Sequence, residues 1–295
     1  MPFLEVFSIV FPVFSIIGVG YLFAARRKFS LEPLVDTLLY LTIPALVVSS
    51  LIEKKIDLAE FGVVSCAAVT VVLSTGILAF FFLTITGRRS LKGFYLPTMF
   101  MNSGNMAFPL SLLAFGAEGL TVAVVYYVAI SVLVYTLGIY LAAGKGGWSE
   151  IRRLPLLYAA AVGVGINISG VAVPAPLIAT VDLLGSATIP LMLVSLGYRL
   201  YSIHLQSFWL SLWGAGIRIV CGGIVAALFV AALGIGGVQG KVIILSSAMP
   251  SAAINFIISY RYKADSDLVA SMIALTTLVS LVTTPLLLAL LLNSG

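Results

Sequence analysis

Long apolar runs follow one another along the chain and are separated by short segments that are polar or rich in glycine and proline. A bilayer core requires roughly 20 apolar residues per spanning helix. This pattern predicts an all-α integral membrane protein. Its ten expected spans lie near residues 3–25, 34–51, 61–86, 92–115, 120–143, 155–168, 176–200, 207–233, 241–260 and 268–292.

The fourth run has polar residues near its middle. Its segment Asn102–Leu110 reads NSGNMAFPL, where a spanning helix normally carries leucine or valine. Proline removes a backbone donor and clashes with the carbonyl four residues earlier. Broken backbone is tolerated in a bilayer only where protein buries it or where it lines a polar cavity. We therefore expect span 4 to break, with a second half-helix starting near Ala107.

The chain also contains an internal repeat. Residues 34–51 and 180–197 align at a constant offset of 146, with eight identities in 18 positions. The identities include Asp36/Asp182, Pro44/Pro190 and Ser49/Ser195. The predicted organisation is two five-span repeats, residues 1–143 and 155–295, joined by a cytoplasmic linker, residues 144–154.

Because five is odd, the second repeat enters the membrane inverted, as in many secondary transporters. When the same offset of 146 is applied further along the chain, residues 102–105 align with residues 248–251, which lie inside the segment SSAMPSAAINF. Span 9 is therefore predicted to break as well. Two symmetry-related breaks near the middle of the membrane indicate a substrate site.

Composition and charge support a membrane location. The chain is 61% hydrophobic and 9% charged, with a mean hydropathy of +1.17. Of its 16 basic residues, 12 fall in loops on one side, three on the other, and Arg218 inside span 8. The positive-inside rule then places both termini on the non-cytoplasmic side of a multi-pass protein, expected in the inner (plasma) membrane. The net charge of +5 reflects topology, and no nucleic-acid partner is predicted.

Around the two breaks the sequence resembles the auxin efflux carrier family, which includes plant PIN-type carriers and bacterial permeases of the malate and malonate type. The family's asparagine seven residues before the crossover proline of span 4 is matched by Asn102 and Pro109. Its Pro-x-x-x-x-Pro-Phe pattern in span 9 appears as Pro250 to Phe256, with Asn255 at the second proline. The resemblance covers essentially the whole chain.

The resemblance implies a fold like that of the bile-acid/sodium symporters, with spans 4 and 9 crossing in an X. Spans 3–5 and 8–10 would form a transport domain, and spans 1, 2, 6 and 7 a scaffold that forms a homodimer. Related sodium-coupled carriers place a carboxylate at the span-9 crossover, where this chain has Ser246, Ser247, Ser251 and Asn255. The coupling ion, proton or sodium, is left open, and no cofactor is predicted.

Candidate substrate-binding residues lie at the two breaks and after the span-2 and span-7 prolines. Asn102 and Asn105 offer amide groups, and the half-helix start beside them favours an anion. The alternative is that these asparagines satisfy only the backbone freed by Pro109. The remaining candidates are Pro109 in span 4, Ser251 and Asn255 in span 9, and Ser49 and Ser195 after the proline kinks, where the family places substrate-facing residues.

Three charged residues inside the spans have two interpretations each. Arg218 is either the counter-charge for a carboxylate substrate or a structural group paired with Asp36, Asp182 or backbone carbonyls. Asp36 and Asp182 are either carboxylates placed near a helix N-terminus, where the helix dipole favours them, or groups that carry protons for coupling.

The sequence thus predicts a secondary active transporter of a small organic anion, a carboxylate or auxin-like acid, working by alternating access at the crossover of spans 4 and 9. Its partners would be that anion and the lipid bilayer. A sodium/proton antiporter or sodium-coupled symporter of the same fold is the alternative, and a channel or membrane sensor a more distant one. Enzymatic motifs are missing, so an enzyme is not predicted.

Overall fold

The computed structural model describes residues 2–28, 30–53, 58–144, 152–201 and 207–293. Within these residues, the helices form ten spanning segments. In the same described residues, seven helices are long and apolar enough to span a bilayer, and Pro155–Ser169 is a shorter apolar helix. The two remaining segments are the interrupted spans 4 and 9. The predicted helical membrane fold is confirmed.

The first repeat begins with span 1, which is α1 (Pro2–Arg26). Span 2 consists of α2 (Glu32–Thr37), the π-helix η1 (Leu38–Thr42) and α3 (Ile43–Glu53), and span 3 is α4 (Leu58–Ile85). Span 4 starts with the short η2 (Lys92–Phe94) and α5 (Tyr95–Met99) and resumes after the break in α6 (Ala107–Leu133). The rest of α6, the π-helix η3 (Val134–Gly138) and α7 (Ile139–Ala143) form span 5.

The second repeat begins with span 6, which is α9 (Pro155–Ser169). Span 7 is α10 (Ala175–Ser186) and α11 (Thr188–Tyr201). Span 8 consists of α12 (Phe208–Ala215), the π-helix η4 (Gly216–Cys221) and α13 (Gly222–Ala232). Span 9 is α14 (Gly237–Ser247) and α15 (Ile254–Arg261), and span 10 is α16 (Ser266–Asn293).

Within α6, one glycine separates the second half of span 4 from span 5. Gly116 has φ 68° and ψ −159°, which is not a helical conformation. Glycine reaches positive φ at little steric cost because it has no Cβ. The chain therefore changes direction at Gly116, between the spans expected near residues 92–115 and 120–143.

The irregular positions of the two repeats correspond at the offset of 146. The break between α5 and α6, residues 100–106, corresponds to residues 246–252, and the break between α14 and α15 covers residues 248–253. In spans 2 and 7, η1 ends at Thr42 and α11 begins at Thr188, each two residues before a proline. The irregular backbone near these prolines agrees with the predicted kinks.

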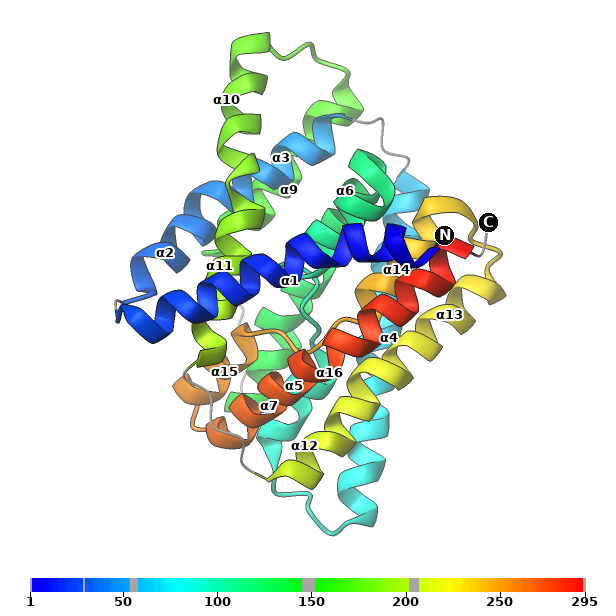
Figure 1. Ribbon diagram of the computed structural model, residues 1–295. Helices are drawn as coiled ribbons and strands as arrows, with labels where there is room; N and C mark the ends of the chain where they lie inside the picture. The colour runs from blue at the N-terminus through cyan, green and yellow to red at the C-terminus, as the bar shows by residue number, and fades with distance from the viewer. Residues whose placement is uncertain (1, 29, 54–57, 145–151, 202–206, 294–295) are drawn as a thin grey trace.

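The helices pack in two groups (Figure 1). In one, α1 packs on α11, and α3 packs on α9 and α10; in the other, α4, α6, α12, α13, α14 and α16 contact one another. The start of α1 and the end of α16 lie near each other, and an even number of spans requires them to be on the same side of the membrane. Which group moves remains a prediction, and most of the expected linker, residues 144–154, lies outside the described residues.

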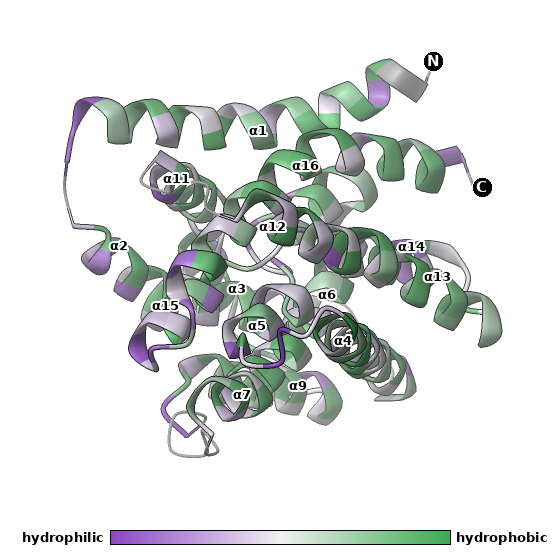
Figure 2. Cartoon of the chain, turned by 90° about the horizontal axis from the view of Figure 1, so that it is seen from below, coloured by the Kyte–Doolittle hydropathy of each residue, from purple (hydrophilic) through white to green (hydrophobic). Residues whose placement is uncertain are grey.

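The outer surface is apolar. On α16, Val282, Leu286 and Leu290 repeat every four residues and are 61–69% exposed. Figure 2 shows the long helices coloured as hydrophobic over most of their length, with hydrophilic residues mainly near helix ends and in loops. Such a large exposed apolar surface fits a lipid environment.

Candidate functional site

The two interrupted spans cross at their breaks and hydrogen-bond to each other there. Met101 and Ser251 form an antiparallel bridge. The backbone N–H of Asn102 donates to the carbonyl oxygen of Pro250 at 2.7 Å, and the N–H of Ala252 donates to that of Phe100 at 3.1 Å. The backbone groups freed by one break are thus satisfied by the other, and the antiparallel pairing agrees with an inverted repeat.

Ser251 and Asn255 stabilise this crossover from inside the protein. Both are fully buried. The Asn255 side-chain amide donates to the carbonyl oxygen of Phe100 at 2.9 Å and to the Ser251 hydroxyl at 3.0 Å. The Ser251 N–H donates to the hydroxyl of Thr276. Their contacts are therefore with the protein, and neither is among the described lining residues of the cavities below.

Asn102 combines a capping bond with an unused donor. Its side-chain oxygen accepts a hydrogen bond from the N–H of Asn105 at 3.1 Å, and the Asn105 amide points to the carbonyl oxygen of Met192 at 3.5 Å. Asn102 is 4% exposed, and its Nδ2 has no hydrogen-bond partner among the described residues. Pro109 lies in the first turn of α6, where its missing N–H breaks no established helix. The half-helix begins at Ala107, as predicted.

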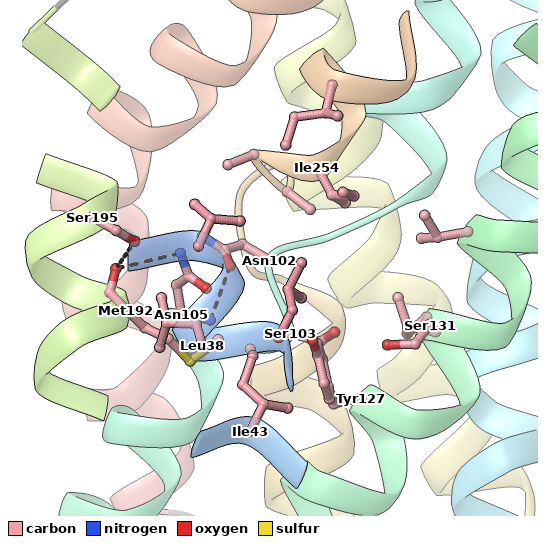
Figure 3. A pocket seen from close by; sticks show the side chains of 18 of the residues that line it. Leu38, Ile43, Asn102, Ser103, Asn105, Tyr127, Ser131, Met192, Ser195 and Ile254 are labelled. Atoms are coloured by element: carbon pink, nitrogen blue, oxygen red, sulfur yellow. Dashed lines mark hydrogen bonds between the residues drawn. The ribbon is translucent and has the colours of Figure 1, made fainter. Parts of the chain in front are cut away.

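A cavity of about 130 Å³, which we call the crossover pocket, lies against the span-4 break (Figure 3). Asn102 and Asn105 approach α11 there, and Tyr127 and Ser131 of α6 lie on the opposite side. The lining residues come from both repeats: Val35, Leu38, Leu39, Ile43, Met101, Asn102, Ser103, Gly104, Asn105, Tyr127, Ile130, Ser131, Val134, Tyr135, Met192, Ser195, Arg199, Ala252, Ala253, Ile254 and Ile257.

A larger cavity of about 430 Å³, the vestibule, adjoins the crossover pocket. The two cavities share lining residues, including Tyr127, Ser131 and Tyr135, which repeat every four residues along span 5. Arg153 and Arg261 also line the vestibule. The vestibule therefore lies between the crossover pocket and the side of the molecule that carries these two arginines.

Arg218 is fully buried and contacts backbone carbonyls. Its guanidinium donates to the carbonyl oxygens of Thr98 at 3.1 Å, Met99 at 2.8 Å and Ser247 at 2.6 Å. These carbonyls are at the C-terminal ends of α5 and α14, where the helix dipole is negative. Arg218 does not line the crossover pocket or the vestibule. Of its two interpretations, this geometry favours the structural one.

The span-2 and span-7 candidates are divided between the outer surface and the cavity. Ser49 donates a hydrogen bond to the carboxylate of Asp182, which is exposed, and Asp36 is exposed too. None of these three lines either cavity. Ser195 is buried, donates to the carbonyl oxygen of Met192 at 2.8 Å, and lines the crossover pocket. The structure thus brings Asn102, Asn105 and Ser195 together in one cavity.

Several polar residues that line the crossover pocket were not among the predicted site residues: Ser103, Tyr127, Ser131, Tyr135 and Arg199. The sequence does contain a signal for most of these residues. Tyr127, Ser131 and Tyr135 repeat at helical spacing inside an apolar span, and Arg199 follows Ser195 by four residues. Arg199 fell near the end of the span expected at residues 176–200 and was counted with the basic residues of the cytoplasmic side, and α11 continues past it to Tyr201.

Comparison with known proteins gives one family and two relatives. Residues 148–288 match the model of a family described as membrane transport protein. An uncharacterized transporter of Methanothermobacter thermautotrophicus is 29% identical over 254 residues, which cover 83% of each chain. An uncharacterized transporter of Methanocaldococcus jannaschii is 26% identical over 298 residues, covering 93% of this chain and 95% of that protein.

These matches agree with the resemblance seen at the two breaks and with the helical membrane fold. The chain is thus similar to the membrane transport protein family over residues 148–288, and to two proteins named as transporters over most of its length.

Proposed function

We propose that the protein is a secondary carrier that moves a small organic anion, a carboxylate or auxin-like acid, by alternating access. The anion would bind in the crossover pocket, between the break of span 4 and the face of α11. Binding at the interface of two inverted repeats is the common arrangement in secondary transporters.

The observation that carries this proposal is the unused donor of Asn102. A buried amide hydrogen without a partner costs about 1–3 kcal/mol, and Asn102 Nδ2 lacks one at the edge of a cavity. A carboxylate oxygen in the crossover pocket would accept from it and offset that cost. Much of the remaining lining is apolar, for example Leu38, Ile43 and Ile130, which suits an acid with an apolar body.

The charge of the lining residues supports an anion as well. Arg199 lines the crossover pocket, and Arg153 and Arg261 line the vestibule. Among the described lining residues of both cavities there is no aspartate or glutamate. A cavity lined by charges of one sign raises the local concentration of the opposite ion. This favours an anion carrier over a sodium/proton antiporter of the same fold.

The position of the vestibule indicates to which side of the membrane this conformation is open. Arg153 and Arg261 belong to the loops that the positive-inside rule assigns to the cytoplasm. In our proposal the structure is therefore open to the cytoplasm, with both termini outside the cell membrane. The scaffold homodimer implied by the resemblance is part of the same proposal, as is a coupling ion, proton or sodium.

Binding is tested first by thermal unfolding of the purified protein with a panel of acids: indole-3-acetate, phenylacetate, malonate and malate. A ligand at 100 times its Kd stabilises the folded state by about 2.7 kcal/mol. Asn102→Ser keeps a capping oxygen and loses Nδ2, so it should melt like wild type without ligand and lose the ligand-induced shift.

Transport is tested in proteoliposomes loaded with the unlabelled acid. A carrier shows saturable uptake and counterflow of labelled acid, and repeating the assay with sodium and pH gradients identifies the coupling ion. Conductance without counterflow would indicate a channel. Binding by no acid of the panel, or a full shift in Asn102→Ser, would contradict the proposed site.

A further inference from the structure

One face of α11 is directed at the crossover pocket over two turns. Met192, Ser195 and Arg199 all line the pocket, and their spacing of three and four residues puts them on the same helix face. Figure 3 shows Met192 and Ser195 on this helix, next to Asn105. Arg199 lies one turn beyond Ser195, in the last turn of α11.

The four arginines in or near the site differ in what they can reach. Arg218 contacts three carbonyl oxygens at the crossover and lines neither cavity. Arg153 and Arg261 line only the vestibule. In the described part of the chain, Arg199 is thus the basic residue that lines the same pocket as Asn102.

We propose that Arg199 is the residue that selects a carboxylate in the crossover pocket, pairing with it while Asn102 Nδ2 donates a second bond. This inference rests on the proposed function and identifies the counter-charge within that site. Arginine is suited to the role because its planar guanidinium binds carboxylate with two parallel bonds and stays charged.

The two donors belong to different repeats, Asn102 to the span-4 break and Arg199 to span 7. A carboxylate held by both would add a link between the two groups of helices, which also touch through α1 and α16 and through α3 and α6. The bound anion would then stabilise the state in which α11 and the span-4 break are close together. An uncharged isostere would lack this bridge.

The test compares an acid with its neutral amide. Binding of indole-3-acetate, phenylacetate, malonate and malate, and of indole-3-acetamide and phenylacetamide, is measured on purified wild type, Arg199→Gln and Arg199→Lys. We expect wild type to bind an acid of the panel, and Arg199→Gln to bind that acid at least about tenfold more weakly. The affinity of Arg199→Gln for the amides should equal that of wild type. The acid affinity of Arg199→Lys should lie between those of wild type and Arg199→Gln.

Arg153→Gln is the matched control, because it removes a cavity arginine outside the crossover pocket. It should reduce acid binding much less than Arg199→Gln. Arg199→Lys keeps the test informative if the glutamine variant does not fold, because full acid affinity in the lysine variant excludes a bidentate pair.

The outcomes separate the two proposals. Unchanged acid binding in Arg199→Gln would overturn the role of Arg199 and leave the anion carrier standing. Equal losses for acids and amides would also overturn it, since they indicate a structural effect. Failure of wild type to bind any acid would contradict the proposed function, and this inference with it.

Discussion

The side-chain amide of Asn255 donates a hydrogen bond to the carbonyl oxygen of Phe100 at 2.9 Å, and so connects the breaks of the two interrupted spans. The same carbonyl accepts the backbone N–H of Ala252. Asn255 lies where the resemblance places a second crossover proline. A hydrogen bond across the crossover is thus present where the family pattern has a rigid ring.

Asn255→Ala should destabilise the protein. The change leaves Phe100 with one donor fewer and removes the Ser251 contact, at a cost of about 1–3 kcal/mol. The melting temperature without ligand should fall. Asn293→Ala, on the exposed end of α16, is the control and should melt like wild type. Unchanged stability of Asn255→Ala would argue against a bracing role for this residue.

Arg218→Met should be strongly destabilising. It leaves the carbonyls of Thr98, Met99 and Ser247 without this donor in a buried site, and removing a partner from a buried charged network costs about 3–5 kcal/mol. Thermal unfolding in detergent measures the loss, with Arg153→Met as control. A variant of normal stability that no longer binds acids would instead support the counter-charge interpretation of Arg218.

Gly222→Ala should reproduce part of this defect. An added Cβ would collide with the Arg218 guanidinium and with the Ser247 carbonyl oxygen, whereas a Cβ at Gly216, also in span 8, meets nothing within 4 Å. Gly222→Ala should therefore lower the melting temperature, and Gly216→Ala should not.

A double-mutant cycle of Gly222→Ala and Arg218→Met tests whether the alanine destabilises the protein through the Arg218 guanidinium. Residues in contact show non-additive effects of about 0.5–3 kcal/mol. We expect the alanine to cost less once the guanidinium is gone. Strict additivity would show that Gly222 matters for some other contact.

Asp36→Asn and Asp182→Asn should leave the pH dependence of transport unchanged, with uptake rates within about twofold of wild type. Both carboxylates are exposed, and neither lines the crossover pocket or the vestibule. The Asp182→Asn side chain still offers an oxygen to the Ser49 hydroxyl. Uptake at several external pH values checks this, and loss of proton dependence in either variant would identify that residue as a proton carrier.

The breaks could be located from the sequence because their causes are visible in it. Asparagine, glycine and proline inside an apolar run are costly, and the offset of 146 transferred the position from span 4 to span 9. The start of α6 at Ala107 and the pairing of the two breaks agree with that reasoning.

The acceptors of Arg218 and the position of Arg199 were not predictable in this way. Backbone carbonyls occur at every residue, so no pattern specifies Thr98, Met99 and Ser247 as partners. The charge of Arg199 near the end of span 7 was explained by the positive-inside rule, although an arginine in the last turn of a helix can still line an internal cavity. The π-helices in spans 2, 5 and 8 have no clear sequence signal either.

The carbonyl contacts of Arg218 also set an order for biogenesis. Span 8 is synthesised after span 4 and before span 9, so Thr98 and Met99 are available when the guanidinium enters the bilayer, and Ser247 is not yet. An arginine at the centre of a spanning helix raises the free energy of insertion by about 2.5–3.5 kcal/mol. Span 8 is therefore expected to depend on the first repeat for stable insertion, and the crossover to become complete only when span 9 arrives.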